Sequence, residues 1–148
     1  MDVANFKNLF LEYIRKINEN SNKVLNSFCE QFGLTNSQAR ILMLLHQNEV
    51  HTIGSLGNDL CIAGANISAT CKKLEAMGLV DRSRDLDDER VVLVTLTEEG
   101  NRIVQVMDEA LNRKMRKHLE EEPDHTYEEI ITVLKKLNRL LDRVNAEK

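Results

Sequence analysis

Apolar residues recur at three- and four-residue steps along most of the chain, and this spacing predicts a mainly helical protein. The first such stretch is long and is expected to end at Gly33. Thr35 and Gln38 have the spacing of a capping box, in which each side chain satisfies a free backbone N–H of the other residue. They predict the start of a second helix that runs to about Gln47.

Two shorter helices are predicted in the middle of the chain, joined by a tight connection over residues 61–64. Thr52 is suited to be the N-cap of the first, which covers residues 53–60. The second runs from about 65 to 77 and ends at Gly78, since glycine adopts the left-handed conformation without steric cost. Its expected core-facing positions, at i, i+4 and i+7, are Ile67, Cys71 and Leu74.

The apolar period then changes to two, which predicts a β-hairpin. Its strands are expected at residues 79–84 and 90–96, joined by an acidic turn, and the second is rich in β-branched residues. Thr97 is the expected cap of the next helix. Thr126 and Glu129 form another capping-box pattern before a last helix whose apolar residues follow the 4-3-4-3 spacing of a coiled-coil seam.

The predicted fold class is mostly α with a small β-hairpin wing: a winged helix-turn-helix with six helices. Two short helices joined by a tight turn, followed by a hairpin, are typical of that module, expected at residues 35–100. Residues 97–118 are predicted to form a long connecting helix. The outer helices, 1–34 and 119–148, are too long and too apolar on one face for so thin a module. We therefore expect them to form a dimerisation domain with a second copy.

Composition excludes several other classes. The chain has 148 residues, a net charge of −4 and three cysteines, an odd number without C-x-x-C spacing, so free thiols in a reducing compartment are expected. The start lacks the pattern of a secretory signal and no apolar run reaches the length of a membrane span, which predicts a cytoplasmic protein without a membrane partner. No phosphate loop, nucleophile elbow, dinucleotide fingerprint or metal-ligand spacing occurs, so neither an enzyme nor a bound cofactor or metal is expected.

The segment LEAMGLVDRSRDLDDERVVLVTLTEEG (Leu74–Gly100) resembles the recognition-helix end, wing and following helix start of the multiple antibiotic resistance regulator (MarR) family, and residues 34–45 resemble its second helix. The resemblance implies a homodimer that binds a palindromic operator in double-stranded DNA, usually as a repressor. It also implies release by a small phenolic or other amphipathic ligand, or by cysteine oxidation. Three positions depart from the family pattern: Cys61 replaces a turn glycine, Ala69 an often basic residue, and Glu89 an arginine of the wing.

The outward side of the second short helix carries the first set of candidate DNA contacts. Asn66 can pair bidentately with adenine, and Ser68 can bond a base or a phosphate. For both, the alternative is that they cap the helix start. Lys72 and Lys73 are placed for phosphates, the alternative being an ordinary solvated face. The predicted contacts of the recognition helix are Ala65, Asn66, Ser68, Ala69, Lys72 and Lys73.

The wing carries the second set. Arg84 and Arg90 flank its tip, and a narrow minor groove attracts arginine through its negative potential. By the family resemblance Asp88 orients Arg90, so the predicted wing contacts are Arg84, Asp88 and Arg90. Arg82 is expected to be structural, near the base of the hairpin.

Local charge opposes this function. Residues 64–90 hold five basic and six acidic side chains, and Glu89 at the tip should repel phosphates. These features favour an alternative, a winged-helix dimer with weak or no DNA binding that acts through protein–protein contacts, as an anti-repressor does. The two functions differ in their response to salt, because only DNA binding weakens steeply through counterion release.

Overall fold

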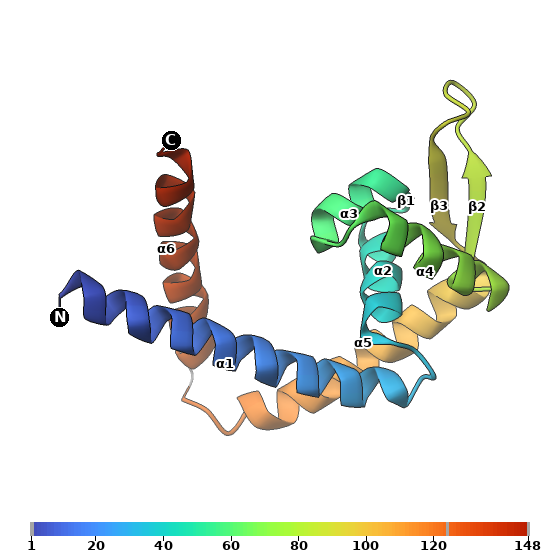
Figure 1. Cartoon of the computed structure of the whole chain (residues 1–148). Coiled ribbons are helices and arrows are strands. Elements are labelled where there is room, and N and C mark those ends of the chain that lie inside the picture. The colour runs from blue at the N-terminus through green and yellow to red at the C-terminus, as the bar shows by residue number, and fades with distance from the viewer. Residues whose placement is uncertain (1, 124, 148) are drawn as a thin grey trace. The chain divides into compact units, whose positions relative to one another are not determined.

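The computed structural model describes residues 2–123 and 125–147 (Figure 1). Within these ranges there are six helices and three strands, in the order α1 (Val3–Glu30), α2 (Asn36–Gln47), β1 (Val50–Thr52), α3 (Ile53–Leu60), α4 (Gly64–Ala76), β2 (Val80–Arg84), β3 (Val92–Leu96), α5 (Glu98–Leu119) and α6 (Thr126–Ala146). The predicted fold class is confirmed. The chain divides into two compact units, one up to Asp108 and one from Glu109 onward. The expected dimerisation domain of residues 1–34 and 119–148 stays a prediction.

Most of the predicted helix starts are confirmed by hydrogen bonds. Thr35 and Gln38 form both bonds of their capping box, and Thr52 does the same with Ser55. The hydroxyl of Thr97 accepts from the backbone N–H of Gly100 at 3.0 Å. These caps satisfy N–H groups that have no partner inside their helices.

The predicted capping box of Thr126 and Glu129 is wrong. The N-cap of α6 is His125, and it makes no side-chain capping bond. Thr126 is already the first helical residue, so its side chain is one position too late to cap the helix. The backbone N–H of Glu129 instead donates to the carbonyl of His125 at 3.0 Å.

The three strands form one antiparallel sheet in the order β1-β3-β2. The predicted hairpin pairs Val80 with Leu96 and Arg84 with Val92. Strand β1 was not predicted, and it adds His51 opposite Val94. With three residues, of which only His51 is buried, β1 is too short to show an alternating pattern.

The core of the first unit fixes the orientation of α4. Ile67, Cys71 and Leu74 are 0–1% exposed, which confirms the predicted core face of this helix. They join apolar side chains of α1, α2, α3, the sheet and α5, among them Phe28, Leu42, Leu56, Val94 and Val104. The opposite face of α4 is therefore turned to solvent.

The connection between α3 and α4 is tight and contains a strained residue. The N–H of Ile62 donates to the carbonyl of Gly57 at 3.0 Å, and a Cβ on Gly57 would lie 2.9 Å from the Ile62 oxygen. Cys61, which ends α3, has φ +53° in the left-handed region. Among the described residues it is the one non-glycine position with positive φ.

Cys61→Gly is expected to raise the free energy of unfolding by about 0.5 kcal/mol, because relief of left-handed strain exceeds the entropy that glycine adds to the unfolded chain. The midpoint of urea unfolding at a fixed protein concentration measures the change. Cys61→Ala is the matched control: it removes the thiol but keeps the Cβ, so no gain is expected. Equal gains from both variants would contradict strain at this position.

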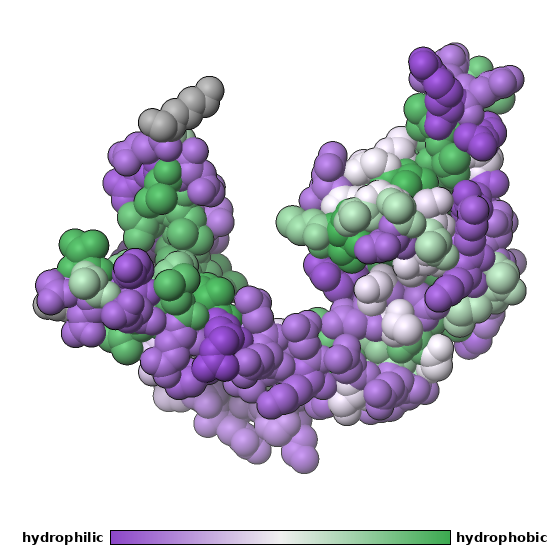
Figure 2. Space-filling model, in the orientation of Figure 1, coloured by the Kyte–Doolittle hydropathy of each residue, from purple (hydrophilic) through white to green (hydrophobic). Residues whose placement is uncertain are grey.

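The helices α1 and α6, each considered by itself, leave many apolar side chains uncovered. No residue within Thr126–Ala146 is buried, and Figure 2 shows hydrophobic patches over this helix. Its exposed apolar residues are Tyr127, Ile130, Ile131, Val133, Leu134 and Val144. Those of α1 are Val3, Phe6, Leu9, Leu11, Tyr13, Ile17 and Val24. In the part of the chain that the structure describes, no helix combines the length and apolar character needed to cross a membrane.

Candidate nucleic-acid interface

The outward face of α4 presents the predicted recognition residues together. Five of the six are exposed and Ser68 is half-buried. The Asn66 side chain forms no hydrogen bond, and Lys72 and Lys73 no ion pair, with any residue of the described ranges. Their donors and acceptors are therefore free for a partner.

The N-terminus of α4 is open. Its N-cap is Ala63, and there is no side-chain capping bond, so the alternative that Asn66 or Ser68 caps this helix is excluded. Because α4 begins at Gly64, one residue earlier than predicted, the N–H groups of Gly64 and Ala65 also lie in its first turn. Uncapped N–H groups at a helix start attract anions such as phosphate. In the sequence, this open helix start is indicated by Ala63, since the N-cap position usually holds a polar residue.

Four bonds tie the end of α4 to the wing and to α5. The Arg82 guanidinium on β2 donates to the Glu75 carboxylate on α4 at 3.1 Å. The hydroxyl of Thr97 donates to the Gly78 carbonyl at 2.7 Å, and its backbone N–H donates to the Leu79 carbonyl at 3.1 Å. The N–H of Leu79 in turn donates to the Leu74 carbonyl at 3.0 Å. The predicted structural role of Arg82 agrees with its position, which is only 17% exposed.

The wing turn is shaped by Asp85. One of its carboxylate oxygens accepts from the backbone N–H groups of Asp87 and Asp88, at 2.7 and 3.2 Å. Such a turn satisfies backbone donors that the strands cannot. The Arg84 guanidinium donates to the backbone carbonyl of Glu89 at 3.0 Å, which closes the turn from the other side.

Asp88 holds Arg90, as the family resemblance implied. The Nε of Arg90 lies 3.1 Å from Oδ1 of Asp88, and the same oxygen accepts from the Arg90 backbone N–H at 3.0 Å. The side-chain bond from Arg90 lowers the pKa of Asp88 most, and the backbone bond lowers it further, so the pKa lies below its usual range. The Arg90 side chain is 91% exposed and so remains accessible on its outer side.

Arg90→Ala is expected to raise the pKa of Asp88 toward, but not fully to, its usual range, because the backbone bond remains. Carbon-detected NMR titration of the Asp88 carboxyl measures this.

The pKa of Asp88 is lowered in the folded state, so the pair contributes to stability above the usual aspartate pKa. That contribution is lost as the pH falls through the lowered value. Glu99, whose pKa is lowered by Arg102, is an internal control and should not change. An unchanged Asp88 titration would contradict the pairing.

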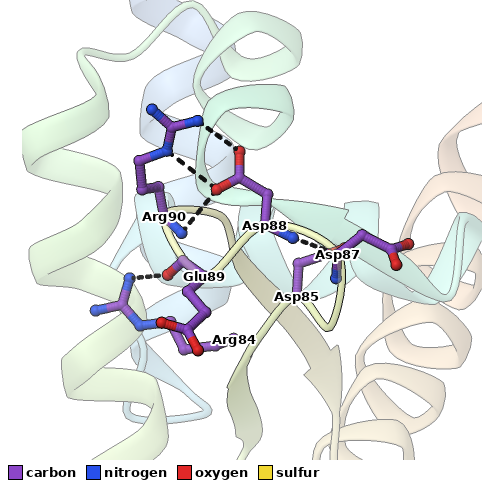
Figure 3. Close-up of polar contacts among 6 residues, drawn as sticks. All are labelled: Arg84, Asp85, Asp87, Asp88, Glu89 and Arg90. Carbon is purple, nitrogen blue, oxygen red and sulfur yellow. Dashed lines mark hydrogen bonds and ion pairs between the residues drawn. The ribbon is translucent and has the colours of Figure 1, made fainter.

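The charges of the wing tip are divided between its two sides. Figure 3 shows the side chains of Arg84, Glu89 and Arg90 on one side of the loop and Asp87 pointing to the other. Asp85 and Asp88 are engaged in the turn and with Arg90. Among the tip residues drawn in Figure 3, Glu89 is therefore the acid on the arginine side that forms no hydrogen bond or ion pair through its carboxylate.

The cysteines are free thiols in different environments. Cys71 is fully buried and burial raises its pKa to about 11, while burial also raises the pKa of Cys29. A raised pKa removes the reactive thiolate. Cys61 is exposed. Across residues 2–123 and 125–147, no group of three or more His, Cys, Asp or Glu side chains is placed to hold a metal ion.

Sequence comparison relates the chain to regulators of transcription. The family described as transcriptional regulator SarA/Rot matches residues 23–107. Transcriptional regulator ZitR of Lactococcus lactis subsp. cremoris (strain MG1363) is 39% identical over 101 residues, which are 68% of this chain and 69% of ZitR. The organic hydroperoxide resistance transcriptional regulator of Bacillus subtilis (strain 168) is 34% identical over 71 residues, and this match covers 48% of each protein. The chain thus spans about half the length of the second relative.

Solved structures share the architecture over nearly the whole chain. BldR from Sulfolobus solfataricus has a TM-score of 0.80 at 27% identity, covering 97% of this chain and 99% of BldR. Reduced AbfR bound to DNA has a TM-score of 0.79 at 24% identity, with 95% of both chains covered. Apo MarR from E. coli has a TM-score of 0.74 at 20% identity, covering 85% of this chain and 93% of MarR.

Proposed function

Because this chain belongs to the SarA/Rot family of transcriptional regulators and has the MarR-type winged-helix fold, we propose that it binds double-stranded DNA at a palindromic operator as a homodimer. The family is not an enzyme class. The observation that carries the proposal is the exposed, unpaired polar face of α4, whose N-terminus is open, in the same unit as a wing with two arginines on one side.

Each element has a distinct proposed role. Asn66 and Ser68, near the start of α4, contact base edges in the major groove, with the small Ala65 and Ala69 allowing close approach. Lys72 and Lys73, further along the helix, contact phosphates and supply affinity without specificity. Arg84 and Arg90 enter the adjacent minor groove, with Asp88 holding Arg90 in place.

Dimerisation is proposed from the uncovered apolar residues of α1 and α6. Burying such faces against a second copy removes apolar surface from water, which is worth about 25 cal/mol per Å². A two-fold axis through that contact would present two α4 helices to two half-sites, and this matches the symmetry of a palindrome. Repression, release by a small amphipathic ligand and a cytoplasmic location are further parts of the proposal, and they rest on the family.

A second candidate function is favoured by the acidic wing. Asp87 and Glu89 are exposed, and Ala69 on α4 supplies no charge. A winged-helix dimer with such a surface could act through protein contacts, as an anti-repressor, and bind DNA weakly.

Fluorescence anisotropy distinguishes the two functions. The purified protein is titrated against DNA from upstream of its own gene, with excess nonspecific competitor, across a salt series. We expect saturable binding of one dimer to a short inverted repeat, with affinity falling steeply as salt rises. A folded dimer that shows no binding above competitor would favour the protein-contact function.

A further inference from the structure

The wing tip holds a free carboxylate, that of Glu89, in a hollow that it shares with two arginines. Arg84, Glu89 and Arg90 line a shallow hollow of about 570 Å³. Both arginines have partners. Arg84 donates to the backbone carbonyl of Glu89, and Arg90 donates to the carboxylate of Asp88. The carboxylate of Glu89 itself makes no hydrogen bond or ion pair with any residue in 2–123 or 125–147. It is an unused acceptor on the side of the wing that the proposed function turns toward DNA.

The minor groove offers this carboxylate few partners. An A·T pair shows only acceptors there, whereas a G·C pair adds one donor, the N2 amino group of guanine. An arginine only donates hydrogen bonds and an ionised carboxylate only accepts them. Arginines therefore suit A·T acceptors and the negative potential of a narrow A·T groove, and that same potential repels a carboxylate. A wing that carries both types of group is suited to a different sequence from a wing that carries arginines alone.

We propose that Glu89 makes the wing select a G·C pair, by accepting a hydrogen bond from the N2 amino group of guanine in the minor groove. The positive charges of Arg84 and Arg90, which line the same hollow, offset the repulsion between this carboxylate and the phosphates. Asp87 takes no part, since its side chain points to the opposite side of the loop (Figure 3). The inference rests on the proposed function, because it needs the wing to enter the minor groove of an operator.

Inosine provides the test. Operators are first selected from random duplexes with the full-length protein, and each G·C pair of a selected operator is then replaced in turn by inosine·C. Inosine lacks the N2 amino group but keeps the major-groove edge of guanine, so contacts of α4 are unaffected. For the wild-type protein, we expect inosine to weaken operator binding about tenfold when it replaces a guanine that the wing reaches. This is the usual cost of one wrong base pair.

Two variants assign the effect to its residue. In Glu89→Ala the loss caused by inosine should disappear at those same positions. Asp87→Ala, the matched control, removes one acid from the other side of the tip and should keep the loss. Glu89→Arg should bind more tightly and prefer A·T at those positions.

The outcomes separate this inference from the proposed function. If an operator is bound tightly but inosine has no effect anywhere, or the same effect in wild type and Glu89→Ala, the selection by Glu89 is overturned while DNA binding stands. If no duplex is selected, the proposed function fails and the inference fails with it.

Discussion

Gly100→Ala is expected to lower the free energy of unfolding by about 3 kcal/mol, the upper end of the usual cost of overpacking. Gly100 lies in the first turn of α5, and a Cβ there would overlap the backbone carbonyl oxygen of Leu79 and lie 3.0 Å from its carbonyl carbon. Leu79 is held on both sides, since its N–H donates to Leu74 and its carbonyl accepts from Thr97. Backbone fixed in this way cannot move aside as a flexible side chain could.

Urea unfolding at a fixed protein concentration measures the loss, since the stability of the proposed dimer would depend on concentration. Gly54→Ala is the matched control. Gly54 also lies near the start of a helix, but a Cβ there would meet only the Thr52 hydroxyl at 3.7 Å, an ordinary contact. That variant should be neutral or slightly more stable, because alanine favours helix. Equal midpoints for Gly100→Ala and the wild type would show that α5 does not need this close approach.

Asn66→Ala is expected to weaken operator binding by about a hundredfold. A bidentate contact to adenine is worth about 1–3 kcal/mol, and a dimer makes this contact in both half-sites. A loss of about 1.4 kcal/mol in each half-site lowers the affinity about tenfold twice, which gives a hundredfold. The side chain is exposed and unpaired, and it is not used to cap α4. Its removal should therefore leave the free energy of unfolding unchanged.

Binding to nonspecific DNA provides the comparison for this variant. Asn66→Ala should keep its nonspecific affinity, because a base contact carries specificity only. Lys72→Ala should instead weaken specific and nonspecific binding alike and lower the slope of affinity against salt. If Asn66→Ala lost both kinds of binding equally, the residue would contact the backbone and not a base.

Local patterns predicted the helices and the core face of α4 well. Capping at Thr35 and Thr52 and the left-handed Gly78 depend on neighbours within four residues, and such short-range bonds are visible in sequence. The core-facing side of α4 follows from helical period alone. The outward face of α4 was therefore predictable as the side opposite its core residues.

The features that sequence could not supply depend on distant neighbours or on single residues. Strand β1 exists because His51 can pair with Val94, which is 43 positions away, and three residues carry no detectable period. The sum of charges over residues 64–90 could not show that Asp87 and the two arginines lie on opposite sides of the tip. At α6, a capping pattern was present but out of register by one residue.

The bonds that join Glu75 to Arg82 and Thr97 to Gly78 and Leu79 have a mechanical consequence. They join the end of α4, the base of the wing and the start of α5 through hydrogen bonds. A rotation of the first turns of α5 would then carry the recognition helix and the wing through the same angle. If the chain binds DNA as proposed, an effector that reorients α5 would withdraw both elements together, and DNA release from each half-site is expected to occur in a single step.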